Sequence, residues 1–507
     1  MKKYILLFLL LCATASIYVL LPAKKTDDFA SLSKNRFSDD DFVSMGDHSF
    51  KLKGKDFFPL AVNYMAAMQT DGKEYWARPA IDYSRDTSKV NMTKEACLRE
   101  LRADMILIRK MGFNSVRVVG FSEVSLADDS NKFSALEARL FVGSDKFIAQ
   151  SLSDSTIDQK YFDALAQLFK EANDAGLKII LAVRTRPEVL TTEIFLDRIT
   201  KYFRNDATLM AYDLFNEPLY FDKPERNKKE IHEVTRKWKR LCHRNAPRQL
   251  VTIGLSGIRE VHAWDPTTID VDFVSFHPYE HEPEQVRNEL TWYNRFVKKP
   301  WIIGETAIPA DNDSVPYEDQ KLFAEKTLTQ AHNCGAWGYT WWQYKDVHWP
   351  KFHSSFMGVT NWKGETILPG DNLVVYGTVK PVAEAFQKFN PSAPKGECIC
   401  LSNYYNYSKH RDFSVKGKLV DDKNNPIEGG IIVAWDKTWK DLYHTISKAD
   451  GSFELFGNFP FYHWMASANA YTMVRGESLP SIAKRDSNGT LTIDLGNLKI
   501  IKLSFED

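Results

Sequence analysis

The sequence lacks the features that mark several classes of protein. Lys plus Arg and Asp plus Glu number 66 each in 507 residues, so no excess charge points to a nucleic acid or another polyanion as partner. No internal repeat or low-complexity tract is found. Cysteine is scarce: beyond Cys12 only five occur, an odd number at scattered positions. They predict free, mostly buried thiols, with no disulfide framework and no structural metal.

Long apolar runs are also lacking, with one exception at the N-terminus. Two lysines precede the apolar segment 4–21 and polar sequence follows it, as in an export signal. Residues 13–15 offer a small-x-small cleavage site, but the segment is nearly long enough to span a bilayer uncleaved. Residues 1–23 are therefore expected to be a signal peptide or an N-terminal membrane anchor. The chain is expected to be exported, to the periplasm, the cell surface or the medium.

Short apolar strands alternate with longer amphipathic helical patterns through most of the chain. The expected strands are "FFPLAVNY" (57–64), "SVRVVGF" (115–121), "KIILAV" (178–183), "LMAYDLFN" (209–216), "QLVTIGLS" (249–256), "DFVSFHPY" (272–279), "KPWIIGE" (299–305) and "GAWGYTWWQY" (335–344). Eight such strands over about 340 residues favour a (β/α)8 TIM barrel over a doubly wound sheet.

The rest of the chain divides around this pattern. The polar, acidic residues 24–49 are expected to form a leader, and 50–392 the barrel domain. A segment without clear periodicity, 393–411, reads as a linker. Residues 412–507 contain short strands separated by "DKNNP" and "ADG" turns, which predicts a small all-β sandwich.

Polar residues gather where the expected barrel strands end. They are Arg117 in the second strand, Asn216 and Glu217 after the fourth, His277 and Tyr279 after the sixth, Glu305 after the seventh, and Trp341 and Trp342 in the eighth. Because all strands of a parallel barrel end on one face, these side chains are expected to share a pocket. Two carboxylates on opposite sides of a pocket are what glycoside hydrolysis requires: one protonates the leaving oxygen and the other attacks the anomeric carbon.

The motifs "FNEP", "FHPY", "IIGET" and "YTWWQY" occur in this order at those strand ends. Together they resemble the retaining glycosidases of clan A, most closely glycoside hydrolase family 5, over roughly residues 50–390. The resemblance implies that Glu217 is the acid/base and Glu305 the nucleophile. It implies no cofactor and no metal.

The same resemblance implies five substrate-binding residues. Asn216 would bond to the sugar 2-hydroxyl, and Arg117 would lie beneath the nucleophile. Tyr279 would hold the nucleophile by a hydrogen bond, and His277 would contact the leaving-group side. Trp342 would stack under the sugar at the cleavage point.

Other aromatic residues and two departures from the family pattern leave the substrate open. Trp349, Trp362 and Trp264 are candidates either for outer sugar contacts or for packing. The opening "KGKDFFPLAVNYM" resembles the family's β-mannanases, but Leu219 stands where these often have Arg, and Arg184 stands where cellulases commonly have His. Both β-mannan and β-glucan types therefore remain.

The C-terminal segment "VKGKLVDDKNNPIEGGIIVAW" resembles carboxypeptidase-regulatory-like domains, which serve as accessory or spacer modules. Such a module is expected to be dispensable for the folding and activity of the barrel.

The sequence thus predicts an exported, monomeric, retaining O-glycosyl hydrolase that acts on an oligo- or polysaccharide. Two alternatives stay open. A non-catalytic glycan-binding or surface protein on the same fold is disfavoured because both carboxylates are present. A transglycosylase would use every residue named above.

Overall fold

The computed structural model describes residues 37–84, 90–127, 132–142, 146–151, 155–183, 185, 191–222, 225–280, 282–477 and 480–505. The predicted signal peptide or anchor, residues 1–23, lies outside these ranges. Within them, no helix combines the length and the apolar character needed to cross a membrane.

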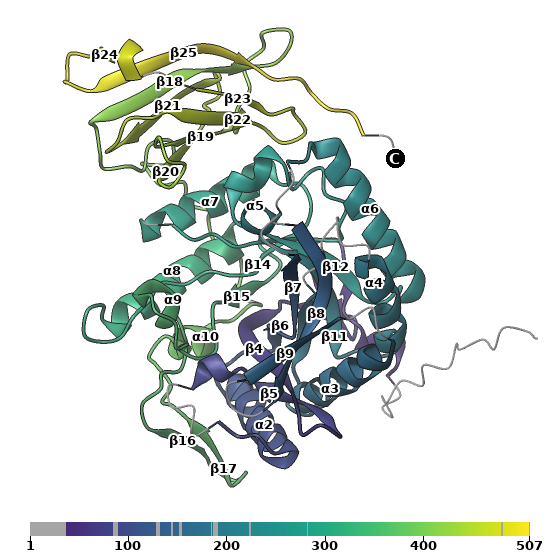
Figure 1. Cartoon of the computed structure of the whole chain (residues 1–507). Coiled ribbons are helices and arrows are strands. Elements are labelled where there is room, and N and C mark those ends of the chain that lie inside the picture. Colours follow the sequence, from purple (N-terminus) through teal and green to yellow (C-terminus); the bar gives the residue numbers. More distant parts are fainter. Residues whose placement is uncertain are drawn as a thin grey trace, which may run out of the picture.

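Eight parallel strands close into a barrel (Figure 1). In order they are β4 (Leu60–Thr70), β6 (Ser115–Val119), β10 (Lys178–Ala182), β11 (Leu209–Asn216), β12 (Leu250–Leu255), β13 (Val274–Phe276), β14 (Trp301–Ile303) and β15 (Tyr339–Trp341). The last strand pairs with the first, Tyr339 opposite Leu60, which closes the sheet. The predicted TIM barrel is confirmed, and each expected strand overlaps an observed one.

Helices surround the barrel between successive strands (Figure 1). They are α2 (Lys94–Lys110), α3 (Ser155–Asp174), α4 (Thr191–Phe203), α6 (Lys228–Asn245), α7 (Pro283–Phe296), α8 (Tyr317–Asn333) and α10 (Ala383–Lys388). In α2, Leu101, Met105 and Ile108 recur at helical spacing and are buried against the sheet. In α6, the side chains of Asn227 and Glu230 form a reciprocal capping box that fixes the helix start.

Additional strands lie outside the eight-strand pattern. After β4, the chain forms β5 (Tyr75–Pro79), antiparallel to it. After β6 comes an antiparallel meander of β7 (Ser122–Ala127), β8 (Lys132–Val142) and β9 (Lys146–Ser151), and β8 also pairs with the end of β4. After β15, a hairpin joins β16 (Glu365–Leu368) to β17 (Leu373–Tyr376).

Short strands pack onto the amino-terminal end of the barrel. They are β1 (Ser44–Met45), β2 (Phe50–Leu52) and β3 (Lys55–Phe57). Phe50 is fully buried, and its ring lies 5.1 Å from that of Phe273 and 5.2 Å from that of Trp337. Val43, in the described part of the predicted leader, is also buried there. From residue 37 onward, the leader therefore packs in part against the base of the barrel.

The predicted all-β sandwich consists of two four-stranded sheets. One contains β18 (Phe413–Val420), β21 (Ser452–Gly457), β24 (Lys484–Arg485) and β25 (Leu491–Lys499); the other contains β19 (Ile431–Trp435), β20 (Leu442–Ile446), β22 (His463–Ser467) and β23 (Val474–Glu477). Alternate residues of β19, such as Ile432, face the interior of the sandwich, whereas Ile431 and Val433 belong to the core cluster of the barrel.

The sandwich is joined to the barrel through buried polar contacts as well. The Lys228 ammonium donates to Asp265 Oδ2 (2.8 Å), Ser467 Oγ (2.9 Å) and the Ala468 carbonyl (2.8 Å). Trp292 Nε1 donates to the Gly429 carbonyl at 2.9 Å. A shared core with paired charges does not fit the expectation of a dispensable module.

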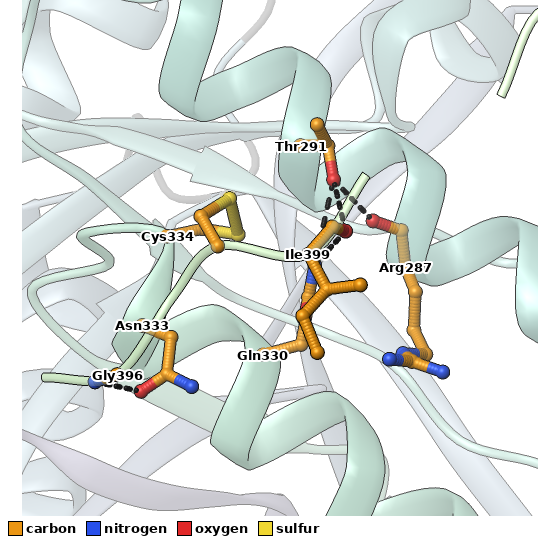
Figure 2. Close-up of a disulfide and its surroundings, with 8 residues drawn as sticks. Arg287, Thr291, Gln330, Asn333, Cys334, Gly396 and Ile399 are labelled. Carbon is orange, nitrogen blue, oxygen red and sulfur yellow. Dashed lines mark hydrogen bonds between the residues drawn. A yellow bond between two sulfur atoms is a disulfide. The ribbon is translucent and has the colours of Figure 1, made fainter. Parts of the chain in front are cut away.

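The predicted linker, 393–411, lies along α7 and α8. The Ile399 carbonyl accepts hydrogen bonds from Thr291 Oγ1 (3.0 Å) and Gln330 Nε2 (2.7 Å), as Figure 2 shows. A disulfide joins Cys334, at the end of α8, to Cys398. The segment is therefore anchored to the barrel.

The prediction of free thiols is wrong for this pair. The two cysteines are 64 residues apart in sequence, and the packing of the segment on α8 brings them together. The spacing of cysteines along the sequence does not reveal this contact. Free thiols in the described residues are Cys97 and Cys242, which are buried, and Cys400, which is exposed.

Candidate active site

Two adjoining cavities, of about 220 and 270 Å3, lie at the carboxyl ends of the barrel strands. Both are lined by Glu217, Glu305, Trp342 and Trp349. The predicted catalytic carboxylates therefore lie at one pocket, although β11 and β14, which precede them, are three strands apart in the barrel.

A buried imidazole lies between the two carboxylates. His277 Nδ1 is 3.0 Å from Glu217 Oε1 and 3.7 Å from Glu305 Oε1. One oxygen of each carboxylate and one ring nitrogen lie within 4.8 Å of one another. The imidazole fits because Gly254 and Gly304 have no side chain: a Cβ at either would come within 2.8 Å of the ring.

Glu217 is held at the rim by an unusual backbone conformation. Its φ is +47°, in the left-handed region that residues with a Cβ seldom adopt. Its amide donates to the Gly254 carbonyl at 2.8 Å, and Pro218 begins the short helix α5 (Pro218–Phe221). The buried Glu260 carboxylate accepts from the Leu219 amide and, at 2.9 Å, from the Ser256 amide. These contacts fix the turn that carries Glu217.

Arg117 lies beneath Glu305 and is wholly buried. Its guanidinium donates to Glu305 Oε1, to Asp213 Oδ2 and Asn63 Oδ1 (both 2.8 Å), and to Asn216 Oδ1 (2.7 Å). Burial acts to lower the pKa of Arg117, but the carboxylates of Asp213 and Glu305 outweigh it, and the pKa lies above its ordinary value. Arg117 therefore stays charged under Glu305.

Tyr279 supplies a second donor to the same carboxylate, from its hydroxyl to Glu305 Oε2 at 3.2 Å. Burial, followed by the charges of Glu305 and Glu217, raises the pKa of Tyr279 well above its usual value, so the phenol keeps its proton. Burial also raises the pKa of Glu305, and Glu217 adds to this, whereas His277 and Arg117 counter it.

A family model, "Cellulase (glycosyl hydrolase family 5)", matches residues 86–346. The chain belongs to glycosyl hydrolase family 5. The predicted family is confirmed, and the chain is a glycoside hydrolase (EC 3.2.1) whose substrate is a carbohydrate.

No curated protein matches the chain in sequence. Among solved structures, GH5_18 from Streptomyces cattleya in complex with GlcNAc is 14% identical (TM-score 0.43; 71% of this chain, 85% of that chain). The glycoside hydrolase family 5 mannosidase from Rhizomucor miehei is 12% identical (TM-score 0.43; 69% and 97%). Beta-glucuronidase 2 from Bacteroides uniformis is 12% identical (TM-score 0.45; 90% and 48%), so the chain spans about half the length of that protein.

Some tryptophans near this family 5 site line the cavities, and others are buried in the core. Trp342 lines both cavities, whereas Trp341 is buried on the other side of the strand, with Nε1 donating to the Met357 carbonyl at 2.9 Å. Trp349 also lines both cavities. Trp264 packs in the core against Phe215, with ring centres 5.0 Å apart. The two neighbouring tryptophans thus point to opposite sides, as extended backbone requires.

The sequence did not single out Asn63 or Asp213, which the family 5 site uses to hold Arg117. Each is a fully or almost fully buried polar residue inside an apolar strand. Asn63 Nδ2 also donates to the Gly304 carbonyl at 3.0 Å, which links the first strand to the seventh. The signal that could have found them is a lone polar residue within an apolar strand.

Two clusters in the described part of the chain could hold a metal ion by geometry: Glu217, His277 and Glu305, and Glu280, Glu289 and His444. In the first, Arg117 already donates to a carboxylate. In the second, burial and the neighbouring Glu280 raise the pKa of Glu289 to about 8.

Proposed function

We propose that the chain is a retaining glycosidase that cleaves β-linked glycans by double displacement, with Glu305 as nucleophile and Glu217 as acid/base. The observation that carries this is the separation of the two carboxylates, whose nearest ligand oxygens lie within 4.8 Å. Retaining enzymes place the carboxyl groups roughly 5–5.5 Å apart, whereas inverting enzymes need about 6.5–9.5 Å to admit a water.

The surrounding donors fit these roles. Glu305 must be ionised to attack the anomeric carbon, and it accepts from Arg117 and Tyr279, which stabilise the charge. Glu217 must deliver a proton to the leaving oxygen and then take one from water, and it carries no such arginine contact among the described residues. Asn216 uses its Oδ1 on Arg117, which leaves its Nδ2 to donate to a sugar 2-hydroxyl. Trp342 offers a ring face at the cleavage point.

The substrate proposed is a β-mannan or β-glucan type of oligo- or polysaccharide, on the resemblance of the strand motifs. We also propose that the chain is monomeric and that it is exported by means of its N-terminal segment. That segment is either cleaved or kept as a membrane anchor. The Cys334–Cys398 disulfide supports export, because disulfides persist in oxidising compartments. The C-terminal sandwich is proposed to be a carboxypeptidase-regulatory-like domain.

Azide rescue tests the two roles. On an aryl glycoside with a good leaving group, Glu217→Ala should still form the glycosyl-enzyme and then stall. Azide needs no general base, so it should release the β-glycosyl azide. Glu305→Ala with azide should give the α-azide, because attack comes directly from the opposite face.

NMR of the products reads the stereochemistry. Swapped products would reverse the two roles. If wild type neither hydrolyses nor transfers a sugar from any glycan in a broad panel, the catalytic assignment fails.

A further inference from the structure

A larger cavity, of about 550 Å3, lies apart from the catalytic pair. It is lined by the chain after β4, by α2 and the residues before it, and by the β16–β17 hairpin. These elements lie on the side of the barrel away from the sandwich (Figure 1). Its lining residues include Arg78, Tyr83, Glu100, Lys345, Trp362 and Tyr376, none of which lines the catalytic cavities. The volume is within the range of roughly 300–1,000 Å3 typical of ligand sites.

Lys345 is the unexplained residue of this cavity. It is 3% exposed, and in the described part of the chain its ammonium makes no hydrogen bond and no ion pair. The nitrogen lies 5.9 Å from the ring centre of Tyr83 and 5.6 Å from that of Tyr344. Burying an ammonium without a partner is costly, so a buried lysine normally has an anion or several acceptors.

The neighbouring polar groups already have partners. Arg78 donates to Gln69 Oε1 at 2.8 Å, and Glu100 Oε2 accepts from Asn91 at 2.7 Å. Glu365, on β16, is exposed. No carboxylate of the described lining thus pairs with Lys345.

The buried carboxylate of Asp104 is also occupied. Burial raises the pKa of Asp104 to about 6 against the lowering effect of Lys345. Its oxygens accept from the hydroxyls of Tyr64 (2.6 Å) and Tyr344 (2.7 Å). Asp104 therefore interacts with the Lys345 charge electrostatically, but the two side chains form no ion pair in the described structure.

Aromatic side chains complete the lining. Trp362 is half-buried, and Tyr376 on β17 is 49% exposed. Aromatic faces pack well on the apolar faces of sugar rings, and a few placed polar groups orient the ligand. A cation beside aromatic rings is suited to bind a sugar ring that carries an anionic group.

We propose that this cavity is a second saccharide-binding site, separate from the catalytic pair, for a sugar ring that bears an anionic group, either a carboxylate or a sulfate. The Lys345 ammonium pairs with the anion, and Trp362 and Tyr376 contact the ring. The proposal does not depend on the catalytic roles, because no residue of this cavity takes part in them.

Calorimetric titration of the full chain tests this proposal, with Glu217→Gln present in every protein to suppress turnover. The probes are trigalacturonate, a sulfated galacto-oligosaccharide and the same galacto-oligosaccharide without sulfate. At least one anionic probe should bind more tightly than the neutral galacto-oligosaccharide. Lys345→Met should weaken that binding about tenfold or more, the expected effect of losing a charge-assisted contact. Lys363→Met removes an exposed charge from the same loop and should leave it unchanged.

A second pair of variants tests the proposal even if Lys345→Met does not fold. Tyr376→Ala should weaken binding of the anionic probe, whereas Ile367→Ala, at a 70% exposed position of the same hairpin, should not. The proposal is overturned if neither anionic probe binds, if the neutral galacto-oligosaccharide binds as tightly, or if the Lys363 and Ile367 controls lose as much affinity as the test variants.

Discussion

Removing the buried Lys228 ammonium should strongly destabilise the protein. The side chains of Lys228 and Asp265 are 2% and 0% exposed, and their ion pair measures 2.8 Å. Lys228→Met would leave the Asp265 carboxylate buried without its cation, and breaking a buried pair in this way costs about 3–5 kcal/mol. It would also leave the Ser467 hydroxyl and the Ala468 carbonyl without this donor, at the contact between α6 and the sandwich.

Urea unfolding followed by tryptophan fluorescence measures the effect as a lower free energy of unfolding. Asp265→Asn should also destabilise, and the double variant should cost less than the sum of the two, because neither charge is then left alone. Arg475→Met breaks an ion pair with Glu225 at the same boundary between domains, but both side chains are exposed, 52% and 74%. Its cost should stay below about 1 kcal/mol.

The large cost expected for Lys228→Met arises because both charges of the pair are removed from water. If Lys228→Met costs no more than Arg475→Met, the pair is hydrated in solution, and the sandwich does not form one packed body with the barrel. If the double variant costs the full sum, the two side chains do not interact.

Burial raises the pKa of Glu305, so the acid limb of kcat/KM should lie above the ordinary glutamate range; Arg117→Gln removes a group that lowers this pKa, and the limb of any residual activity should move to still higher pH. Cys334→Ser should lower the free energy of unfolding by about 2–4 kcal/mol, whereas Cys400→Ser should not change it, as denaturant titration can show. A chain ending at residue 405 should be poorly soluble or less stable by thermal melting, because it exposes the core surface shared with the sandwich; a soluble, fully active truncation would contradict the shared core.

The barrel could be predicted because its strands are local signals. Runs such as 178–183 and 209–216 are apolar throughout, as strands covered on both faces must be, and each is followed by a helical pattern. The position of Glu217 and Glu305 at one pocket was also predictable, since a carboxylate directly after such a run is costly unless it lies at the rim. The meander of β7, β8 and β9 was missed: these strands lie between β6 and α3, where the repeating strand–helix pattern gives no reason for extra strands.

Contacts between distant segments could not be predicted. The disulfide between Cys334 and Cys398 depends on how residues 393–411 lie on α8, and nothing near either cysteine encodes that path. The sandwich was recognisable from its turns, but the residues that cover it belong to the barrel. Lys228, at the start of an amphipathic helix, has the pattern of a solvated charge, and its burial becomes evident only with Ala468 and its neighbours in place.

One guanidinium links the fold of this family 5 site to its chemistry. The groups that accept from Arg117 come from three parts of the barrel: Asn63 on the first strand, Asp213 and Asn216 on the fourth, and Glu305 after the seventh. A lysine has one nitrogen and cannot replace this fork of donors, so Arg117→Lys would leave buried acceptors unpaired. Strands one, four and seven would then lose a shared hydrogen-bond partner at the same point where the Glu305 carboxylate loses its cation. Stability and the ionisation of Glu305, the proposed nucleophile, therefore depend on the same set of hydrogen bonds.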